Sequence, residues 1–493
     1  MTLRSPRSEF VRKALLALAP ALLLLATAGN AAASNKQESI FQDDRFFGDP
    51  AKQIGALDTV QSLGVDTVHV VVGWRTLAPS PDSKKKPKGF NGADPADYPA
   101  ESWDRFDGLV REATKRHINL LLSPAGPIPA WATDCKSTGT PAACRPNVKE
   151  YTAFFTAVVK RYSGKYSDAN SGGKLPKVSR FSVWNEPNLR SWIQTAPNKS
   201  TVAGNAGIYR NLVYAAQTGL VKGKQPRATL LIGELAPLND SLAFYYALFC
   251  IDSKGKSLKG GAAKKASCKS GKRIKRFKAT GIAHHPYTRG GQPPFKRGHK
   301  NDLTLADISK LEKAVTQGAK AGAVKRGLPI YFTEFGVSTN PPDTKFGVSP
   351  DKQAEALNHA EYVGYLDKNV RAYSQFQLSD DTTTGQNGDA ITFQTGLRSR
   401  DDTPKASFGA YRVPIYVTKK GGKVRVWGGA RPGRTGDKIE IQTGSDFKTV
   451  KTVKLSKYGY IDTTIAKPSG KVRLKWTSGG TDMFSREASV ASK

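Results

Sequence analysis

The sequence predicts an α/β fold, a (β/α)₈ (TIM) barrel followed by a small antiparallel β-sandwich. Between about residues 38 and 412, short runs of strand-forming residues alternate with longer amphipathic runs, as in consecutive βα units. Beyond Val413 the helical pattern stops, and short runs of alternating apolar and polar residues are separated by Gly- and Lys-rich turns. An open doubly wound sheet would usually show a Gly-rich turn after its first strand, and none follows the first strand here.

Each expected element is a run whose hydrophobic period fits its type. Strands of the barrel are expected at residues 40–43, 67–73, 119–123, 181–185, 229–233, 281–284, 330–333 and 372–377. Helices are expected at 51–63, 103–116, 148–162, 203–220, 241–249, 303–323, 350–366 and 405–411. Five strands of the sandwich are expected at 424–427, 438–442, 450–455, 460–463 and 472–476.

The first 33 residues are predicted to be a signal peptide. Four basic residues precede an apolar run at 14–26, and Ala31-Ala32-Ala33 offers a cleavage site after Ala33. An uncleaved anchor is the alternative, but the apolar run is short for a bilayer span. Cleavage leaves a barrel domain at 34–412 and a sandwich domain at 413–493. We expect a secreted, extracellular or cell-surface protein that is a monomer without a membrane span.

The four cysteines form two local pairs along the chain, Cys135 with Cys144 and Cys250 with Cys268. Four cysteines allow three connectivities, and in an oxidising compartment we favour the two local disulfides. A zinc site is the alternative, but the chain has no Cys-x-x-Cys spacing and no nearby histidine cluster.

The chain is strongly basic, with a formal net charge of +35. Eleven Lys and Arg residues fall in the segment 254–278. Nucleic acid is not the expected partner, because the basic runs have almost no interleaved aromatic residues and no recognised binding motif. Two readings remain open: a solvated basic surface without a dedicated partner, or a surface that binds an anionic cell-surface polymer or a uronate-bearing polysaccharide.

Polar side chains gather where the expected barrel strands end, which is where the active sites of such barrels lie. The strand exits carry Trp74, Asn185, Glu186, Glu234, His284, His285, Tyr287, Glu334, Gln375 and Gln377. Glu186 ends the fourth strand and Glu334 the seventh. Paired carboxylates are what hydrolysis of a glycosidic bond requires, one to protonate the leaving oxygen and one to attack or stabilise the sugar cation. We expect neither a metal nor a cofactor.

The motifs Trp184-Asn185-Glu186-Pro187-Asn188-Leu189, His285-Pro286-Tyr287 and Thr333-Glu334-Phe335-Gly336 resemble those of the clan A glycoside hydrolases. The chain is most similar to family 39, with family 5 close behind. The resemblance covers the barrel and not the sandwich.

The resemblance implies a retaining glycoside hydrolase that acts on poly- or oligosaccharides. Glu186 matches the general acid/base and Glu334 the nucleophile, with the two carboxyl groups roughly 5 Å apart. Asn185 matches the residue that binds the sugar 2-hydroxyl. His285 and Tyr287 match residues that line the catalytic subsite, with Tyr287 hydrogen-bonded to Glu334.

The chain departs from the clan at two strands. His69 stands on the second strand where the clan often has an arginine that supports the nucleophile. On the eighth strand, Gln375 and Gln377 stand where the clan commonly has a tryptophan under the sugar, so hydrogen bonding would replace stacking. We include His69, both glutamines and Trp74 among the expected substrate-binding residues.

Several residues carry two open interpretations. Trp74 either stacks on sugars or packs under loops, and Glu234 is either a substrate ligand or a structural partner of an Arg or His. Trp427 and Trp476 either form a sugar platform or, as we favour, belong to the sandwich core. For the whole chain, the substrate class is a β-linked cell-wall or extracellular polysaccharide. The alternative function is a catalytically inactive carbohydrate-binding or surface-attached protein on the barrel scaffold.

Overall fold

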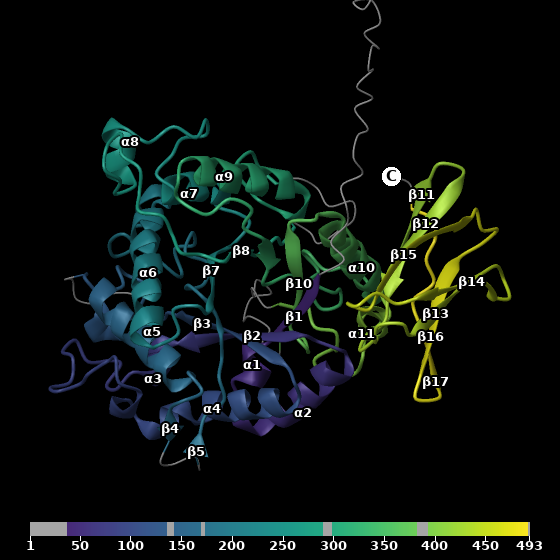
Figure 1. The fold of residues 1–493 in the computed structure, drawn as a ribbon, viewed down its shortest axis with the longest axis horizontal. Coiled ribbons are helices and arrows are strands. Elements are labelled where there is room, and N and C mark those ends of the chain that lie inside the picture. The colour runs from purple at the N-terminus through teal and green to yellow at the C-terminus, as the bar shows by residue number, and fades with distance from the viewer. Residues whose placement is uncertain (1–36, 136–141, 169–172, 289–297, 382–392, 492–493) are drawn as a thin grey trace, which may run out of the picture.

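Eight parallel strands close into a barrel in the computed structural model, which describes residues 37–135, 142–168, 173–288, 298–381 and 393–491 (Figure 1). The strands are β1 Glu38–Gln42, β2 Thr67–Gly73, β3 Asn119–Ala125, β6 Arg180–Ser182, β7 Thr229–Leu235, β8 Gly281–His284, β9 Ile330–Phe332 and β10 Val370–Phe376. Around the barrel they follow chain order, and β10 closes onto β1. A two-stranded hairpin, β4 (Ser167–Asp168) and β5 (Gly173–Lys174), lies outside the barrel sheet. The predicted barrel is confirmed, while the expected signal peptide lies outside the described residues.

Helices follow the strands and cover the outside of the barrel (Figure 1). They are α1 Asp44–Phe47, α2 Pro50–Ser62, α3 Trp74–Leu77, α4 Ala100–Lys115, α5 Val148–Arg161, α6 Val202–Lys222, α7 Ser241–Leu248, α8 Gly260–Lys265, α9 Ile308–Lys320, α10 Pro350–Leu366 and α11 Ala406–Arg412. Side-chain caps fix several of their starts, as where Asn147 accepts from the backbone N–H of Glu150 at α5. The helix expected at 303–323 begins only at Ile308, because a 3₁₀ turn over Leu305–Asp307 precedes it.

The barrel interior changes from apolar to polar toward the carboxyl ends of its strands. Leu121, Leu231 and Ala283 form a buried apolar cluster from three strands. Two residues beyond Leu121 on β3, Ser123 lies 2.6 Å (Oγ) from Nε2 of His69 on β2. The apolar layer therefore closes the barrel below a polar layer, and the polar layer supports the carboxyl-terminal rim.

Two antiparallel sheets follow the barrel as a β-sandwich. One contains β11 (Ile415–Lys420), β12 (Lys423–Gly429) and β15 (Tyr460–Ala466), and the other contains β13 (Lys438–Thr443), β14 (Lys448–Lys454), β16 (Val472–Ser478) and β17 (Thr481–Phe484). All five expected strands are present. The prediction missed β11, which begins only three residues after α11, and β17, a mostly exposed edge strand.

The sandwich packs against α10 through an aromatic cluster of Tyr362, Tyr365, Trp427 and Tyr460. Trp476 lies in the core of the sandwich, as we favoured, whereas Trp427 is buried against α10 in this cluster and not in the sandwich core. Beside the cluster, the buried carboxylate of Glu361 on α10 is paired with the guanidinium of Arg431. The phenol of Tyr460 also donates to Oε1 of Glu361, at 2.7 Å. These contacts join the two domains where α10 lies beside the sandwich in Figure 1.

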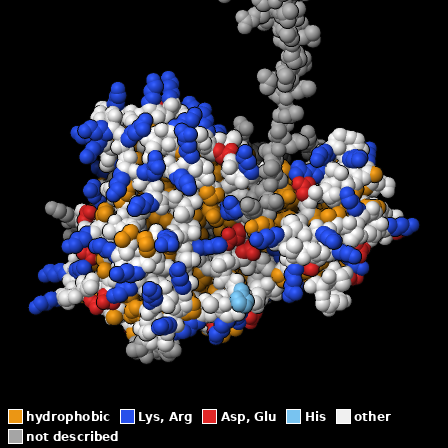
Figure 2. All heavy atoms as spheres, in the orientation of Figure 1, with side chains coloured by type: hydrophobic (Ala, Val, Ile, Leu, Met, Phe, Trp, Pro, Cys, Tyr) orange, Lys and Arg blue, Asp and Glu red, His pale blue; other side chains and the backbone are white. Residues whose placement is uncertain are grey.

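Both expected disulfides are formed, between Cys135 and Cys144 and between Cys250 and Cys268. No helix in the described part of the chain is long and apolar enough to cross a membrane. Lys and Arg side chains are prominent over the molecular surface of both domains (Figure 2).

Arg431→Met is expected to lower the free energy of unfolding by roughly 3–5 kcal/mol, because it leaves the Glu361 carboxylate buried without its partner. Urea denaturation followed by tryptophan fluorescence measures the change. The matched control is Lys471→Met, which breaks the exposed pair with Glu487 and should cost at most about 1 kcal/mol. Equal effects of the two substitutions would contradict a role for the buried pair in joining the domains.

Candidate active site

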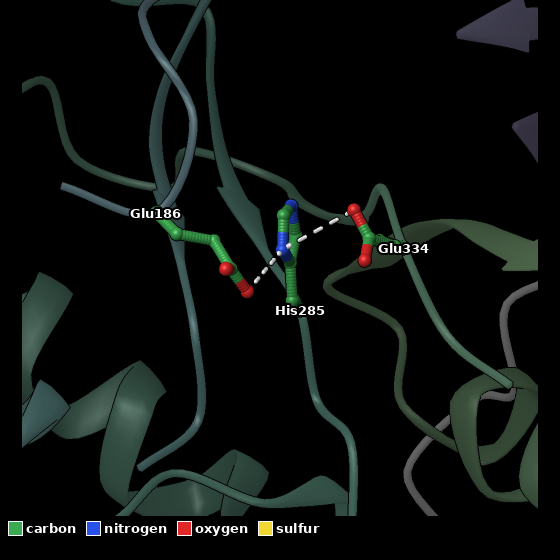
Figure 3. Close-up of side chains that lie close together, drawn as sticks. All are labelled: Glu186, His285 and Glu334. Carbon is green, nitrogen blue, oxygen red and sulfur yellow. Dashed lines mark hydrogen bonds and ion pairs between the residues drawn. The ribbon is translucent and has the colours of Figure 1, made fainter. Parts of the chain in front are cut away.

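Three side chains from three strand ends converge on one point at the carboxyl-terminal rim (Figure 3). Glu186 follows β6, His285 follows β8, and Glu334 follows β9. Nδ1 of His285 lies 3.2 Å from Oε1 of Glu186 and 3.6 Å from Oε2 of Glu334. The imidazole therefore lies between the two glutamates that the sequence singled out.

A third carboxylate holds the other side of the same ring. Nε2 of His285 lies 2.9 Å from Oε2 of Glu234, and both side chains are fully buried. Burial alone would lower the pKa of His285, but Glu334, Glu186 and Glu234 more than offset it, so its pKa stands well above the usual value. With both ring nitrogens protonated, Nδ1–H donates to Glu186 and Nε2–H donates to Glu234.

Glu234 reaches the ring because β7 bulges at this point. The pairing with β8 skips Glu234, with Gly233 opposite Ala283 and Leu235 opposite His284. Gly233 has a φ of +122°, and a Cβ there would lie 2.3 Å from the carbonyl oxygen of Ala283, so the bulge requires glycine. The bulge turns Glu234 inward, where Thr333 Oγ1 also donates to its Oε2 at 2.5 Å.

Glu234 is charged despite its burial. Desolvation would raise its pKa, but the hydrogen bond from His285 and the positive charge of that ring lower it below its ordinary value. Of the two interpretations that the sequence left open, the structure supports the structural partner of a histidine. The carboxylate is too deeply buried to contact a substrate in this conformation.

The backbone at the two neighbouring strand ends is left-handed although the residues are not glycine. Trp184, Glu186 and Glu234 have φ values of +67°, +36° and +48°. Such conformations cost on the order of 1–3 kcal/mol each and cluster at functional sites. The backbone N–H of Glu186 donates to the carbonyl oxygen of Glu234 at 2.9 Å, which fixes the two turns together. These turns also end β6 at Ser182, earlier than predicted.

Glu334 is held by Tyr287, whose hydroxyl donates to Oε1 at 2.7 Å as the resemblance implied. Burial raises the pKa of Glu334 to about 7, and the charges of Glu186 and Asp44 add to the rise, while His285 and Tyr287 oppose it. Asp44, just beyond β1, was missed by the sequence analysis. The adjacent acids Asp43 and Asp44 at a strand exit were the available signal.

A carboxylate oxygen of Glu186 and one of Glu334 lie within 4.8 Å of each other, and a ring nitrogen of His285 lies within the same distance of both. Such a group could also hold a divalent cation, but only if His285 lost a proton, because an imidazolium has no lone pair to offer. The side chain of Glu334 is 8% exposed and that of Glu186 17%, so both are accessible from the rim.

Two expected substrate-binding residues lie elsewhere. Trp74 is fully buried and stacks on Phe154, with ring centroids 5.3 Å apart, so it packs under loops and presents no face to a sugar. His69 is fully buried within the barrel, where Nδ1 donates to the carbonyl oxygen of Thr333 and Nε2 accepts from Ser123. Burial lowers the pKa of His69, so it is a neutral support of the rim and not a substrate ligand.

The two glutamines of β10 are also buried. The Nε2 of Gln375 donates to the carbonyl oxygen of Thr395 at 2.7 Å, and that of Gln377 donates to Asp381 at 2.9 Å. Both amide nitrogens therefore form hydrogen bonds within the protein and are not presented to a sugar. Instead, Phe376 and Phe393 lie against the ring of Tyr287, at centroid distances of 6.4 and 6.3 Å, and Phe393 is 38% exposed. The sequence analysis missed both rings.

Asn185 and His284 complete the rim. Oδ1 of Asn185 is buried beside Glu186 and has no hydrogen-bond partner among the described residues. Nε2 of His284 lies 2.6 Å from the carbonyl oxygen of Leu303, and burial lowers the pKa of His284 to about 4. His284 is thus neutral, with Nε2 bonded to the backbone and Nδ1 buried without a hydrogen-bond partner among the described residues.

No model of a known protein family and no curated protein matches the sequence. Among solved structures, a family 39 glycoside hydrolase from the gut symbiont Bacteroides cellulosilyticus WH2 matches over 89% of this chain and 82% of that chain, with 13% identity and a TM-score of 0.51. GH5_18 from Streptomyces cattleya matches over 76% and 78%, with 14% identity and a TM-score of 0.47. A GH30 endoxylanase from Clostridium papyrosolvens C71 matches over 89% and 95%, with 10% identity and a TM-score of 0.44. The family 39 match confirms the fold that the motifs implied, and at these identities the likeness concerns the fold alone.

Glu234→Gln is expected to lower the pKa of His285, because it removes one of the charges that raise it. Side-chain ¹⁵N NMR across a pH series measures this, since the chain has only six histidines. His284, which is bound to a backbone carbonyl, is the internal control and should stay neutral near pH 7 in both proteins. An unchanged titration of His285 would contradict the proposed charge on Glu234.

Proposed function

We propose that this protein is an exported, retaining glycoside hydrolase that cleaves β-linked bonds in a cell-wall or extracellular polysaccharide. The observation that carries the proposal is the pair of strand-end carboxylates, Glu186 and Glu334, with oxygens within 4.8 Å of each other. Retaining enzymes need a separation of about 5–5.5 Å, whereas inverting enzymes need roughly 6.5–9.5 Å to fit a water molecule. The leader sequence and the two disulfides support export.

In the first step, Glu334 attacks the anomeric carbon while Glu186 protonates the leaving oxygen. Glu334 suits the nucleophile because the Tyr287 hydroxyl and the His285 imidazolium stabilise its charged form. Its orientation is also fixed by the hydrogen bond from Tyr287, which favours attack along one direction. The product of this step is a glycosyl ester of Glu334 and a free leaving group.

In the second step, Glu186 removes a proton from water, and the water attacks the anomeric carbon to release Glu334. Glu186 suits this role because its side chain is the more exposed of the two. When Glu186 is ionised, the Nδ1–H of His285 donates to it. Two displacements restore the original anomeric configuration.

One proton shared by the two carboxyls makes this chemistry possible near neutral pH. Two carboxylates this close resist ionising together, and this repulsion adds to the burial that raises the pKa of Glu334 to about 7. The singly protonated pair supplies one acid and one nucleophile. His285 adds a positive charge between them, so the ionised member of the pair is not left uncompensated.

The sugar contacts follow from the groups around the pair. The unpaired Oδ1 of Asn185 lies next to Glu186 and suits a donor such as the sugar 2-hydroxyl. On the other side, Phe393 and Phe376 supply apolar ring faces near Tyr287 in place of the tryptophan that is absent from β10. We propose that the sugar stacks on the exposed ring of Phe393, in place of the hydrogen bonds that Gln375 and Gln377 were expected to form with it.

Glu334→Ala should lower turnover of an aryl β-glycoside by roughly 10⁴-fold or more, because it removes the nucleophile. Azide should restore turnover and give a glycosyl azide of inverted configuration. With Glu186→Ala, azide should give the retained configuration. Product configuration is read by ¹H NMR, and Glu101→Ala, on the exposed first turn of α4, is the control.

Two outcomes would contradict these assignments. An inverted azide product from the Glu186 variant alone would reverse the two roles. Absence of turnover by the native chain on a panel of aryl β-glycosides and soluble polysaccharides, with polysaccharide binding unchanged in Glu186→Ala, would favour the inactive binding protein.

For the native chain, kcat/KM on substrates with poor leaving groups should fall as pH rises through about 7, because the pair then loses its shared proton. Glu186→Gln removes one source of the repulsion that raises the pKa of Glu334. On dinitrophenyl glycosides, which need no acid, this variant should therefore reach a plateau with a midpoint below about 7. If kcat/KM of Glu186→Gln still falls as pH rises through about 7, the decline must come from a group other than this pair.

A further inference from the structure

Three neighbouring loops on the amino-terminal face of the barrel expose an unusual number of cations. These loops follow α6, α7 and α9 and lead into the adjacent strands β7, β8 and β9. We define the basic face as the exposed Lys and Arg residues of these loops and of the last helical residues before them: Lys222, Lys224 and Arg227; Lys254, Lys256, Lys259, Lys264, Lys265, Lys269, Lys272, Arg273, Lys275, Arg276 and Lys278; and Lys320, Lys325 and Arg326. Blue side chains crowd the region of α8 in Figure 2.

The charge of the basic face is not neutralised by the protein. Within the described residues, no side chain of the basic face forms an ion pair. The only acidic residue in the three loops is Asp252. Its Oδ1 accepts from the backbone N–H groups of Lys254 and Lys256, so it shapes the turn. Seventeen like charges on one surface repel one another, and an anionic ligand would relieve that repulsion.

The loop after α7, which carries most of these charges, is held by a disulfide and by a buried arginine. The disulfide between Cys250 and Cys268 closes it. The buried guanidinium of Arg210 on α6 donates to the carbonyl oxygens of Ala247, Leu248 and Ala266, at 2.5–3.0 Å. A cation enclosed by carbonyl groups ties α6, the end of α7 and the end of α8 into one support.

Further contacts join the loop after α7 to helix α6 and to the loop after α9. The hydroxyl of Tyr214 on α6 donates to the carbonyl oxygen of Lys275 at 2.6 Å. The backbone N–H of Phe277 donates to the carbonyl oxygen of Ala323, in the loop after α9, at 2.8 Å. The basic face is therefore an ordered platform on which the cations have fixed attachment points.

The platform lies at the end of the barrel opposite the catalytic pair. Thr280 is the last residue before β8, and its backbone N–H donates to the carbonyl oxygen of Leu230, near the start of β7. Glu186 and Glu334, by contrast, follow the carboxyl ends of β6 and β9. A ligand of the basic face would therefore not be held by the two catalytic glutamates. The basic face is a separate binding surface.

The side chains of the basic face indicate the class of ligand. Lysine outnumbers arginine nine to two in the segment 254–278, so point charges prevail over the planar, bidentate groups that read bases. The single aromatic residue of that segment, Phe277, is buried, so no ring is presented for base stacking. We propose that the basic face binds a linear polyanionic glycan with a carboxylate or phosphate on each repeat, independently of hydrolysis at the rim.

The test compares two variants that lose the same charge. One combines Lys264→Gln, Lys265→Gln, Lys269→Gln, Lys272→Gln and Arg273→Gln, and the control combines Lys419→Gln, Lys420→Gln, Lys423→Gln, Lys448→Gln and Lys454→Gln on the sandwich. All ten side chains are exposed. Binding to immobilised polygalacturonate and poly(glycerol phosphate) is measured in a Glu334→Gln background, so that no probe is hydrolysed.

At about 50 mM salt the basic-face variant should bind both polymers at least about tenfold more weakly than the control, with a shallower dependence on salt. Loss on one polymer alone would identify its anion as the ligand group. Turnover of an aryl β-glycoside by the same variant with Glu334 intact should stay within about twofold of the native chain.

Equal binding by the two variants would overturn the proposal. So would binding of native protein to neutral dextran as tight as to the polyanions. Preference for single- or double-stranded DNA, or for anionic phospholipid vesicles, over both polymers at equal charge concentration would replace the proposed ligand with that class. Because the assay measures binding in a background without Glu334, its result stands apart from the hydrolysis tests.

Discussion

The arrangement of the carboxyl-terminal rim depends on one imidazole held between three carboxylates. His285 donates on one side to the buried Glu234 and faces Glu186 and Glu334 on the other. A lone carboxylate buried as deeply as Glu234 would normally take up a proton. The bond to His285 keeps it ionised, and its charge in turn keeps His285 protonated. The two proposed catalytic glutamates then share a fixed positive charge that solvent cannot screen.

This arrangement accounts for the departure on the second strand. The resemblance to clan A implied a cation beneath the nucleophile, where this chain has His69. The structure shows His69 as a neutral residue with both nitrogens bonded inside the barrel. The positive charge near Glu334 comes from His285 instead. Moving the cation from β2 to the end of β8 requires a counterion at the end of β7, and the bulge at Gly233 supplies it by turning Glu234 inward.

Much of the fold followed from the sequence, because βα alternation is a long-range pattern that single residues do not disturb. The strand exits were equally visible, so Glu186, Glu334, His285 and Tyr287 were found. The errors at Trp74, Gln375 and Gln377 concern which way a side chain points at a strand exit. That direction depends on bulges, left-handed turns and packing against distant helices, as where Trp74 stacks on Phe154. None of these is encoded by the local pattern around the residue.

The two ends of the barrel differ in how their charged side chains are placed. At the carboxyl end, acids and one imidazole are buried, paired and held within a few ångströms, so their protonation is set by the fold. At the amino end, the cations of the basic face are exposed and form no ion pairs within the described residues, so their effect depends on salt and on the charge of the ligand. Because the basic face is exposed to solvent and counterions, a charge change there is screened within roughly 8 Å at physiological salt and has little effect on groups at the opposite end of the barrel. The proposed binding of a polymer and the proposed cleavage of a bond can thus be altered separately in this scaffold.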